Sequence, residues 1–244
     1  MDSTKRVALI TGANKGIGYE IARQLGQQEI TVLVGSRDAE RGEEAVACLR
    51  DQQLDAHMIV IDVTDSSSVQ HAASEIEERF GRLDILVNNA GISKEQARHR
   101  PSEYPLEALR ETFETNVFAV VTVTKALLPL LLKAPAARIV NQSSSMGSLT
   151  LAADPSSPYA GLNLLGYNSS KAALNSVTLE FSKELSDTPV KVNASDPGYC
   201  ATDLNGHQGY RSPEQGAVAV VRLATLADDG LSGGFFNDEG PVPW

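Results

Sequence analysis

The stretch Thr11-Gly12-Ala13-Asn14-Lys15-Gly16-Ile17-Gly18 follows an apolar run at residues 7–10 and opens a helix-like segment at residues 18–28. Three glycines let a backbone turn tightly and approach a pyrophosphate, and the start of a helix offers N–H groups with a partial positive charge. A glycine trio alone is also compatible with an ordinary strand-to-helix turn. Because this one follows the first strand of an alternating chain, we interpret it as a dinucleotide-binding loop.

The rest of the chain repeats the alternation of short β-branched runs with helix-like segments. Further apolar runs occupy residues 30–34, 57–61, 83–87, 138–140 and 190–192. Helix-like segments lie between them, at residues 39–49, 66–80, 106–132 and 167–186. This order predicts an α/β fold, with one Rossmann-type, doubly wound parallel sheet of about seven strands and helices on both faces. We expect a single domain over residues 1–244.

Three irregular stretches, at residues 92–105, 145–166 and 199–212, each follow a predicted strand. Parallel strands end at one edge of a sheet, where α/β proteins bind their ligands. We therefore expect these three loops to form the walls of a substrate pocket.

Asp65 and Ser212 are each expected to begin a helix, because aspartate and serine cap helix starts. Pro213 follows Ser212, and proline suits the first helical position.

Composition narrows the classes of function. The 244 residues include 42% hydrophobic and 21% charged residues, and the net charge of -10 argues against a nucleic-acid partner. The two cysteines lie far apart without zinc-like spacing, so we expect no metal site and a reducing, cytoplasmic location. The first six residues leave no room for a signal peptide, and polar residues interrupt the apolar stretch 117–132. That stretch is shorter than the ~20 residues of a membrane span, so no membrane is expected.

The tip of the second strand indicates which dinucleotide binds. Enzymes that bind NAD usually place a carboxylate there for the ribose hydroxyls. This chain has Ser36 at that place and Arg37 next to it, and a guanidinium suits a 2′-phosphate. Lys15 is expected near the same ribose. Asp38 is interpreted as the cap of the following helix, although its charge could weaken the preference for phosphate. We therefore predict NADP.

Two further strand ends are expected to contact the cofactor. Asp62, followed by Val63, ends the third strand, where its side chain could bond the adenine edge or could instead cap a turn. Asn88-Asn89-Ala90-Gly91 ends the fourth strand, and its turn-forming residues would let a cofactor approach the backbone. The predicted cofactor contacts in these segments are Gly12, Asn14, Lys15, Gly16, Ile17, Gly18, Ser36, Arg37, Asp62, Val63, Asn89, Ala90 and Gly91.

Tyr167 and Lys171 are spaced by one helical turn, so both side chains leave the same face of a helix. A phenol titrates near ~10, but an ammonium about 4 Å away favours the phenolate by roughly 4 kcal/mol at an effective dielectric of about 20. That would lower the pKa of the phenol by as much as ~3 before burial opposes it. Such a phenol could exchange a proton with a carbonyl oxygen. An exposed helix could also carry this pair without any role.

With these residues identified, the chain resembles the short-chain dehydrogenase/reductase family over essentially its full length. The motifs that match are the loop at residues 11–18, Asn88-Asn89-Ala90-Gly91, Asn116, the serines after the fifth strand, Tyr167 with Lys171, and Pro197-Gly198. Within the family the chain is most similar to the NADPH-dependent carbonyl reductases. That similarity rests on Asn14-Lys15, Val140-Asn141-Gln142-Ser143-Ser144 and the tail from Ser212 to Trp244.

The resemblance implies an enzyme that reduces a ketone, aldehyde or quinone to an alcohol. Tyr167 would donate the proton, and Lys171 would lower its pKa and hold the nicotinamide ribose. Ser144 would bind the substrate oxygen, with Ser143 and Ser145 as alternatives. Asn116 would anchor a water that relays protons to Lys171. The resemblance adds Pro197, Gly198, Thr202, Tyr167 and Lys171 to the cofactor contacts.

The resemblance also leaves alternatives open. Twenty-two residues separate Ser144 from Tyr167, more than is usual in the family, and the extra residues fall at 149–166. A longer insertion there covers the tetramer face in monomeric carbonyl reductases, so a monomer is favoured and a homo-oligomer stays possible. Two rivals remain, a 3-oxoacyl-carrier-protein reductase and a non-catalytic NADP-binding redox sensor. Substrate contacts are expected from Ser144, Met146 and Tyr199, with Leu149 and Leu151 as further candidates.

Overall fold

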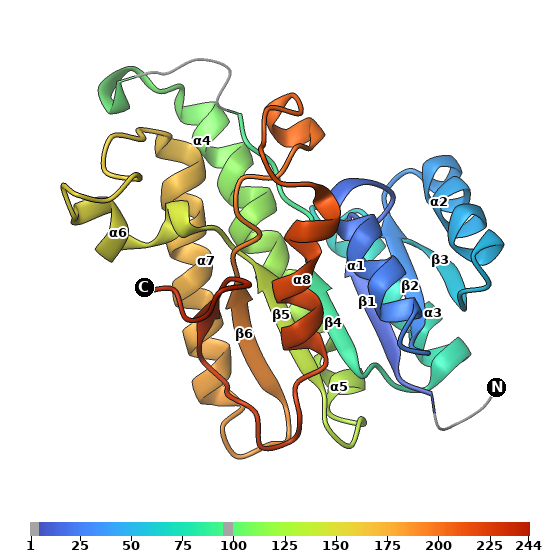
Figure 1. Cartoon of the computed structure of the whole chain (residues 1–244). Coiled ribbons are helices and arrows are strands. Elements are labelled where there is room, and N and C mark those ends of the chain that lie inside the picture. The colour runs from blue at the N-terminus through green and yellow to red at the C-terminus, as the bar shows by residue number, and fades with distance from the viewer. Residues whose placement is uncertain (1–4, 95–99) are drawn as a thin grey trace.

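The structure is a computed structural model that describes residues 5–94 and 100–244. One sheet of seven strands runs through it in the order β3-β2-β1-β4-β5-β6-β7, and every neighbouring pair is parallel (Figure 1). The strands are β1 (Val7–Thr11), β2 (Thr31–Ser36), β3 (Ala56–Val60), β4 (Ile85–Asn88), β5 (Arg138–Gln142), β6 (Lys191–Ser195) and β7 (Phe235–Phe236). The predicted Rossmann-type fold is confirmed.

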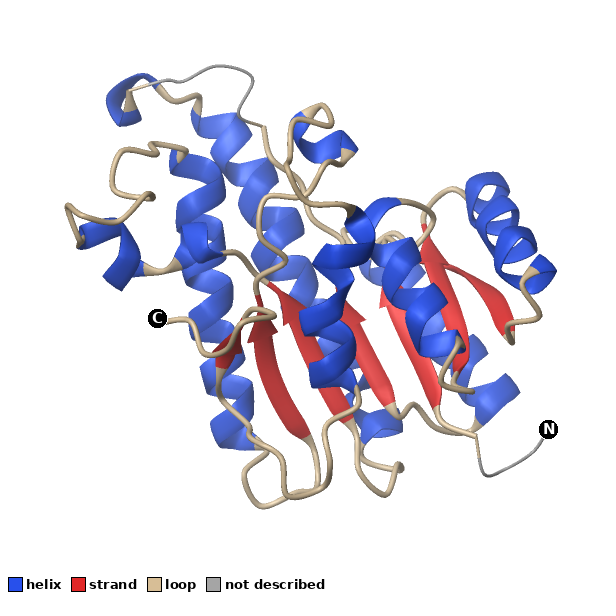
Figure 2. Ribbon diagram, viewed as in Figure 1, coloured by secondary structure: helices blue, strands red, loops and turns tan. Residues whose placement is uncertain are grey.

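Helices cover both faces of this sheet (Figure 2). The α-helices are α1 (Gly16–Gly26), α2 (Ala39–Asp51), α3 (Ser66–Phe80), α4 (Leu106–Phe113), α5 (Ala119–Leu131), α6 (Leu149–Ala153), α7 (Leu165–Glu184) and α8 (Pro213–Ala224). The six predicted strands and the helices α1, α2, α3 and α7 are found with ends shifted by at most three residues. The short α6 and β7 were not predicted as elements.

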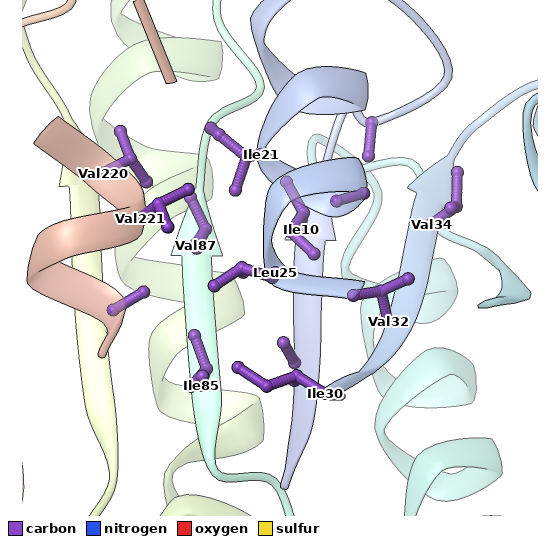
Figure 3. Close-up of a cluster of buried hydrophobic side chains, with 14 of the residues drawn as sticks. Ile10, Ile21, Leu25, Ile30, Val32, Val34, Ile85, Val87, Val220 and Val221 are labelled. Atoms are coloured by element: carbon purple, nitrogen blue, oxygen red, sulfur yellow. The ribbon is translucent and has the colours of Figure 1, made fainter. Parts of the chain in front are cut away.

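The buried strands divide their side chains between two hydrophobic cores. In β1, Ile10 points to the face covered by α1, α2 and α8, where it packs with Ile21 and Leu25 of α1 and Val220 of α8 (Figure 3). Leu9 points to the opposite core, which also contains residues of α3, α5 and α7. Both cores exclude water from the strands, so the near-continuous apolar runs of the sequence are explained.

The helix predicted at residues 106–132 is interrupted. A π-helical turn at Glu114–Phe118 lies between α4 and α5 and holds the buried Asn116. The whole run Leu106–Leu131 is long and apolar enough to cross a membrane, with a mean hydropathy of 1.3 over its most apolar window, but half of that window is buried inside the protein. Packing on the sheet accounts for this composition. The expected absence of a membrane stays a prediction.

A buried set of polar side chains ties two strands to α5 and α7. Asn88 donates to Thr124 at 3.1 Å and to the side-chain oxygen of Asn141 at 2.9 Å. Asn141 in turn donates to the hydroxyl of Thr178 at 2.9 Å. Buried polar groups of this kind are stable only when they are paired, so these bonds specify how β4, β5 and α7 fit together.

The loops at the carboxyl edge of the sheet gather as predicted, at the top of Figure 1. Residues 95–99 of the predicted loop 92–105 lie outside the described residues, as do residues 1–4 of the amino terminus.

The two predicted helix caps are found. Asp65 accepts from the amide of Ser67 at 2.8 Å, and Ser212 accepts from the amide of Gln215 at 3.2 Å.

Candidate active site

The glycine loop between β1 and α1 is shaped as a cradle. Gly12 and Gly16 have φ angles of 64° and 58°, a region that favours glycine. A Cβ at Gly18 would lie 2.5 Å from the side-chain nitrogen of Asn89. That nitrogen donates to the carbonyls of Thr11 at 2.8 Å and Gly12 at 3.2 Å. Asn89 therefore holds the loop against the end of β4.

The start of α1 differs from the starts of α2, α3 and α8. The helices α2, α3 and α8 are capped by Asp38, Asp65 and Ser212. In the described residues, α1 has neither a side-chain cap nor an acidic residue in its first turn. Its amide groups therefore lie open toward the cradle. A pyrophosphate would satisfy them and would be favoured by the helix dipole, so the residues present fit a dinucleotide.

At the tip of β2, the serine and the arginine have different surroundings. Ser36 is buried, and its hydroxyl donates to the carbonyl of Asp38 at 2.8 Å. Asp38 accepts from the amide of Arg41, so its interpretation as a helix cap is confirmed. Arg37 is exposed and forms no ion pair with any residue in the described ranges. Its guanidinium is therefore available to an anion.

Lys15 does not share the surroundings of Arg37. Its ammonium forms an ion pair with Asp203 in the loop after β6, and His207 contacts the other oxygen of Asp203 at 2.8 Å. Thr202 faces the glycine loop, since its methyl carbon would lie 3.7 Å from a Cβ at Gly16. The loop 199–212 therefore meets the glycine loop directly, a contact that the sequence did not indicate.

The ends of β3 and β4 place the other predicted cofactor contacts. Asp62 accepts from the amide and the hydroxyl of Thr64, at 3.0 and 2.7 Å, so it forms the alternative turn cap. The same Asp62 oxygen, Oδ1, accepts both bonds. Val63 is partly buried, and Ala90 donates its amide to the hydroxyl of Thr11 at 3.0 Å. Asn14 and Ile17 stay partly exposed on the glycine loop.

Tyr167, in the first turn of α7, meets Ser144 after β5. A hydrogen bond from the Ser144 side chain lowers the pKa of Tyr167, but burial of the phenol outweighs it and raises that pKa to about 12. Electrostatic interactions with Asp196 and with the Cys200 sulfur raise it further. The phenol therefore keeps its proton at neutral pH, and its side-chain hydrogen bond is with Ser144.

Lys171 does not act on the phenol as predicted. Its ammonium lies over the ring of Tyr167, 5.6 Å from the ring centroid, and donates to the carbonyl of Gln142 at 2.7 Å. Burial lowers the pKa of Lys171 to about 8. The expectation that Lys171 lowers the pKa of Tyr167 is wrong here, because burial dominates for both groups and the sequence does not reveal burial.

The other two serines form hydrogen bonds with other residues. Ser143 donates to Asn175 of α7 at 2.5 Å, and Ser145 donates to the carboxylate of Asp196. Gly198, with a φ of 72°, turns the chain after Pro197 and donates its amide to the same carboxylate at 3.0 Å. Of the three serines, the structure places Ser144 beside the phenol.

Asn116 lies in the π-helical turn, and its side chain forms hydrogen bonds with protein groups. It donates to the carbonyl of Ile92 at 2.9 Å and to Ser170 at 3.0 Å, and accepts from the amide of Ile92 at 2.9 Å. A Cβ at Gly91 would lie 3.3 Å from Asn116 and 3.7 Å from the ammonium of Lys171. Asn116 thus positions the chain after β4 next to Lys171. Its predicted role in holding a water stays a prediction.

The predicted substrate contacts differ in their exposure to solvent. Met146 is partly exposed and Tyr199 is 46% exposed, so both can meet a ligand. Leu149 is largely exposed, whereas Leu151 packs against the small core that contains Phe235. Sequence reasoning missed Tyr159, whose hydroxyl bonds Ser145. No local pattern marks that residue, because its partner lies 14 residues earlier and across a loop.

Gly147 sets the distance between the Ser144 loop and α7. A Cβ there would lie 2.6 Å from the carbonyl carbon of Lys171 and 2.8 Å from the amide nitrogen of Ala172. We expect Gly147→Ala to cost about 1–3 kcal/mol of unfolding free energy and to lower activity, because backbone must move at the site. Urea unfolding and turnover measure this. Gly161→Ala, with no described atom within 4 Å, is the control, and an equal effect of both variants would contradict the argument.

The pKa of Lys171 gives a pH dependence of stability. Between pH 8 and 10.5 the unfolded chain holds a proton on this residue that the folded chain has lost, so stability rises with pH there. Relative to Lys171→Met, the wild type should gain roughly 2–3 kcal/mol from pH 7.5 to pH 10. Urea midpoints at both pH values measure this gain, with the exposed Lys133→Met as a control. A difference between wild type and Lys171→Met that is independent of pH would show that Lys171 is not desolvated.

Three comparisons place the chain among known proteins. The pattern of the family described as short chain dehydrogenase matches residues 6–211. The short-chain dehydrogenase anuI of Penicillium roqueforti is 40% identical over 228 residues, which cover 91% of this chain and 89% of the relative. The (-)-isopiperitenone reductase of Mentha piperita is 33% identical and 97% of each chain is covered. The crystal structure of NADPH-bound carbonyl reductase from chicken fatty liver superposes with a TM-score of 0.84 at 29% identity, covering 98% of this chain and 99% of that chain.

Proposed function

The chain belongs to the short-chain dehydrogenase/reductase family of oxidoreductases, and from that premise we propose that it reduces a small-molecule carbonyl compound to an alcohol with NADPH. The observation that carries this proposal is the meeting of Tyr167 and Ser144, with Lys171 one turn further along α7. Two of the similar proteins are named as reductases, one of them a carbonyl reductase with NADPH bound.

In this proposal Tyr167 donates the proton to the carbonyl oxygen. Its pKa of about 12 keeps the phenol protonated at neutral pH, while the phenol remains a stronger acid than the alcohol that is formed. Ser144 donates a hydrogen bond to the same oxygen and stabilises the charge that develops on it. The bound nicotinamide would supply the hydride at its C4 carbon.

NADPH is favoured over NADH by the tip of β2. Arg37 offers an exposed guanidinium there, and Ser36 replaces the carboxylate that usually accepts the ribose hydroxyls of NAD. The cradle of Gly12, Gly16 and Gly18 and the uncapped start of α1 would hold the pyrophosphate. Lys171 would hold the nicotinamide ribose, since its ammonium lies near Gly91 at the end of β4.

A panel of ketones, aldehydes and quinones tests the proposal, with the oxidation of NADPH followed by absorbance. We expect turnover with at least one carbonyl class and a higher kcat/KM with NADPH than with NADH. Binding of NADPH without turnover of any member of the panel would favour a binding protein over an enzyme. A strong preference for acyl-carrier-protein thioesters would favour the 3-oxoacyl reductase reading instead.

A further inference from the structure

An ion pair between Lys15 and Asp203 joins the glycine loop to the loop after β6. Lys15 directly precedes α1, and Asp203 begins the short 3₁₀ turn Asp203–Asn205. The two side chains are 57% and 54% exposed. The bond from Lys15 holds the pKa of the Asp203 carboxyl below its usual value, so this carboxyl is charged at neutral pH. A lysine that was predicted to contact the cofactor is therefore paired with a carboxylate of the protein.

Asp203 is held in place by its own loop. Its other carboxylate oxygen contacts the imidazole of His207 at 2.8 Å. The amide of His207 donates to the carbonyl of Thr202 at 2.9 Å, and the amide of Thr202 donates to the side-chain oxygen of Asn205 at 3.3 Å. Lys15, in contrast, carries its ammonium on a flexible four-carbon stem and is largely exposed. Lys15 is therefore the member of the pair that can change partners.

The backbones that carry Lys15 and Arg37 are in contact at the carboxyl edge of the sheet. The strands β1 and β2 are adjacent and parallel, and the amide of Ala13 donates to the carbonyl of Gly35 at 2.9 Å. Lys15 comes two residues after Ala13. Arg37 comes two residues after Gly35. A phosphate bound by Arg37 is therefore a second anion that can attract the ammonium of Lys15.

The strengths of the two possible bonds decide between two interpretations of the ion pair. In the first, the pair fastens the two loops over a bound dinucleotide. Exposed ion pairs contribute little to stability, so this fastening would be weak. In the second, Asp203 competes with a phosphate of the cofactor for Lys15. A phosphate monoester carries about two negative charges and three acceptor oxygens, so it binds an ammonium more strongly than a carboxylate does. The second interpretation is therefore favoured.

We propose that Asp203 competes with the 2′-phosphate of NADP for Lys15 and thereby limits the preference of this protein for NADP over NAD. Asp203 then sets cofactor specificity although it lies outside the glycine loop and β2. The inference rests on the proposed use of NADPH. A lysine that is free for only a fraction of the time binds phosphate with an apparent affinity reduced by that fraction. Because an exposed ion pair holds its partners weakly, the expected reduction is roughly two- to sixfold.

Isothermal titration calorimetry with NADP⁺ and NAD⁺, which differ only in the 2′-phosphate, tests this proposal without any turnover. The ratio of the two dissociation constants gives the preference for NADP⁺. Asp203→Asn is expected to raise that preference by roughly two- to sixfold, and Asp203→Ala, which removes the acceptor, by at least as much. Lys15→Gln is expected to lower the preference by roughly tenfold. An unchanged preference in these variants, or an equal weakening of both nucleotides in the Asp203 variants, overturns the proposal.

A double variant shows whether Asp203 acts through Lys15. In the Lys15→Gln background, Asp203→Asn is expected to leave the preference unchanged, because no ammonium remains to be released. A rise in that background would be a general effect of charge and would overturn the proposal. Asp154→Asn is the control for net charge, since the exposed Asp154 ends α6, at the far left of Figure 1 and away from α1. A rise in that variant equal to the rise in Asp203→Asn would also overturn the proposal.

The same titrations separate this inference from the proposed function. The preference of the wild type tests the choice of NADPH as cofactor, and the change in preference in the Asp203 variants tests the competition for Lys15. Neither result depends on whether any carbonyl compound is reduced. Because Asp203 is exposed, its variants are expected to fold, and circular dichroism checks that they do.

Discussion

Tyr167→Phe is expected to lower kcat at least a hundredfold while the dissociation constant of NADPH stays within about threefold of the wild type. A positioned proton donor contributes roughly 10²- to 10⁴-fold to rate, and phenylalanine keeps the ring but has no proton to give. The ring also contacts Lys171, whose ammonium lies 5.6 Å from its centroid, so the packing of α7 is retained. NADPH oxidation and a fluorescence titration measure the two quantities.

Tyr19→Phe is the matched control for this change. It removes a phenolic hydroxyl that accepts a hydrogen bond from Gln52 at 3.2 Å and lies outside the Tyr167–Ser144 site. We expect its kcat to be close to that of the wild type. Turnover in Tyr167→Phe at the level of this control would remove Tyr167 from the mechanism and would leave the proton to another donor.

Arg37→Asp is expected to reduce kcat/KM for NADPH by about a hundredfold and to leave kcat/KM for NADH unchanged or improved. The variant loses a charge-assisted bond to the 2′-phosphate, worth roughly 1.5–3 kcal/mol, and adds repulsion. It also supplies a carboxylate that can accept from the ribose hydroxyls of NADH. Parallel initial-rate measurements with both cofactors test this expectation.

Lys133→Asp provides the control for the change in net charge. Lys133 is exposed, follows α5 and pairs with Glu77, so the variant changes charge by the same amount away from the tip of β2. Exposed pairs of this kind contribute little to stability. A similar loss of NADPH activity in both variants, or none in Arg37→Asp, would mean that the phosphate is held elsewhere. Lys15, now paired with Asp203, would then be the residue to change next.

The order of the strands and helices was predicted from local patterns in the sequence. Helix α3 begins and ends where the sequence places it, because Asp65 caps it and its apolar residues repeat with helical spacing. The features that were missed depend on distant partners. The strand β7 has two residues and exists through pairing with β6, and the π-helical turn holds Asn116, which bonds Ile92 and Ser170. Neither leaves a periodic signal in the sequence.

The active site was predicted only in part, again because some of its contacts join residues that are distant in the sequence. The spacing of Tyr167 and Lys171 and the position of Ser144 follow from short motifs, and the structure brings these residues together. The contact of Tyr159 with Ser145 and the pairing of Lys15 with Asp203 are set by loop conformations. The direction of the Tyr167 pKa was wrong because burial depends on the whole fold.

The bonded series from Asn88 through Asn141 to Thr178 fixes the rotation of α7 about its own axis. Thr178 lies eleven residues after Tyr167, close to three full turns, so both leave nearly the same side of the helix. A slip of one residue would turn that side by about 100° and would separate Thr178 from Asn141. Variants in which loops are exchanged to change substrate choice should therefore keep Asn88 and Asn141. These two amides maintain the orientation of the Tyr167 phenol from some 16 Å away along the helix.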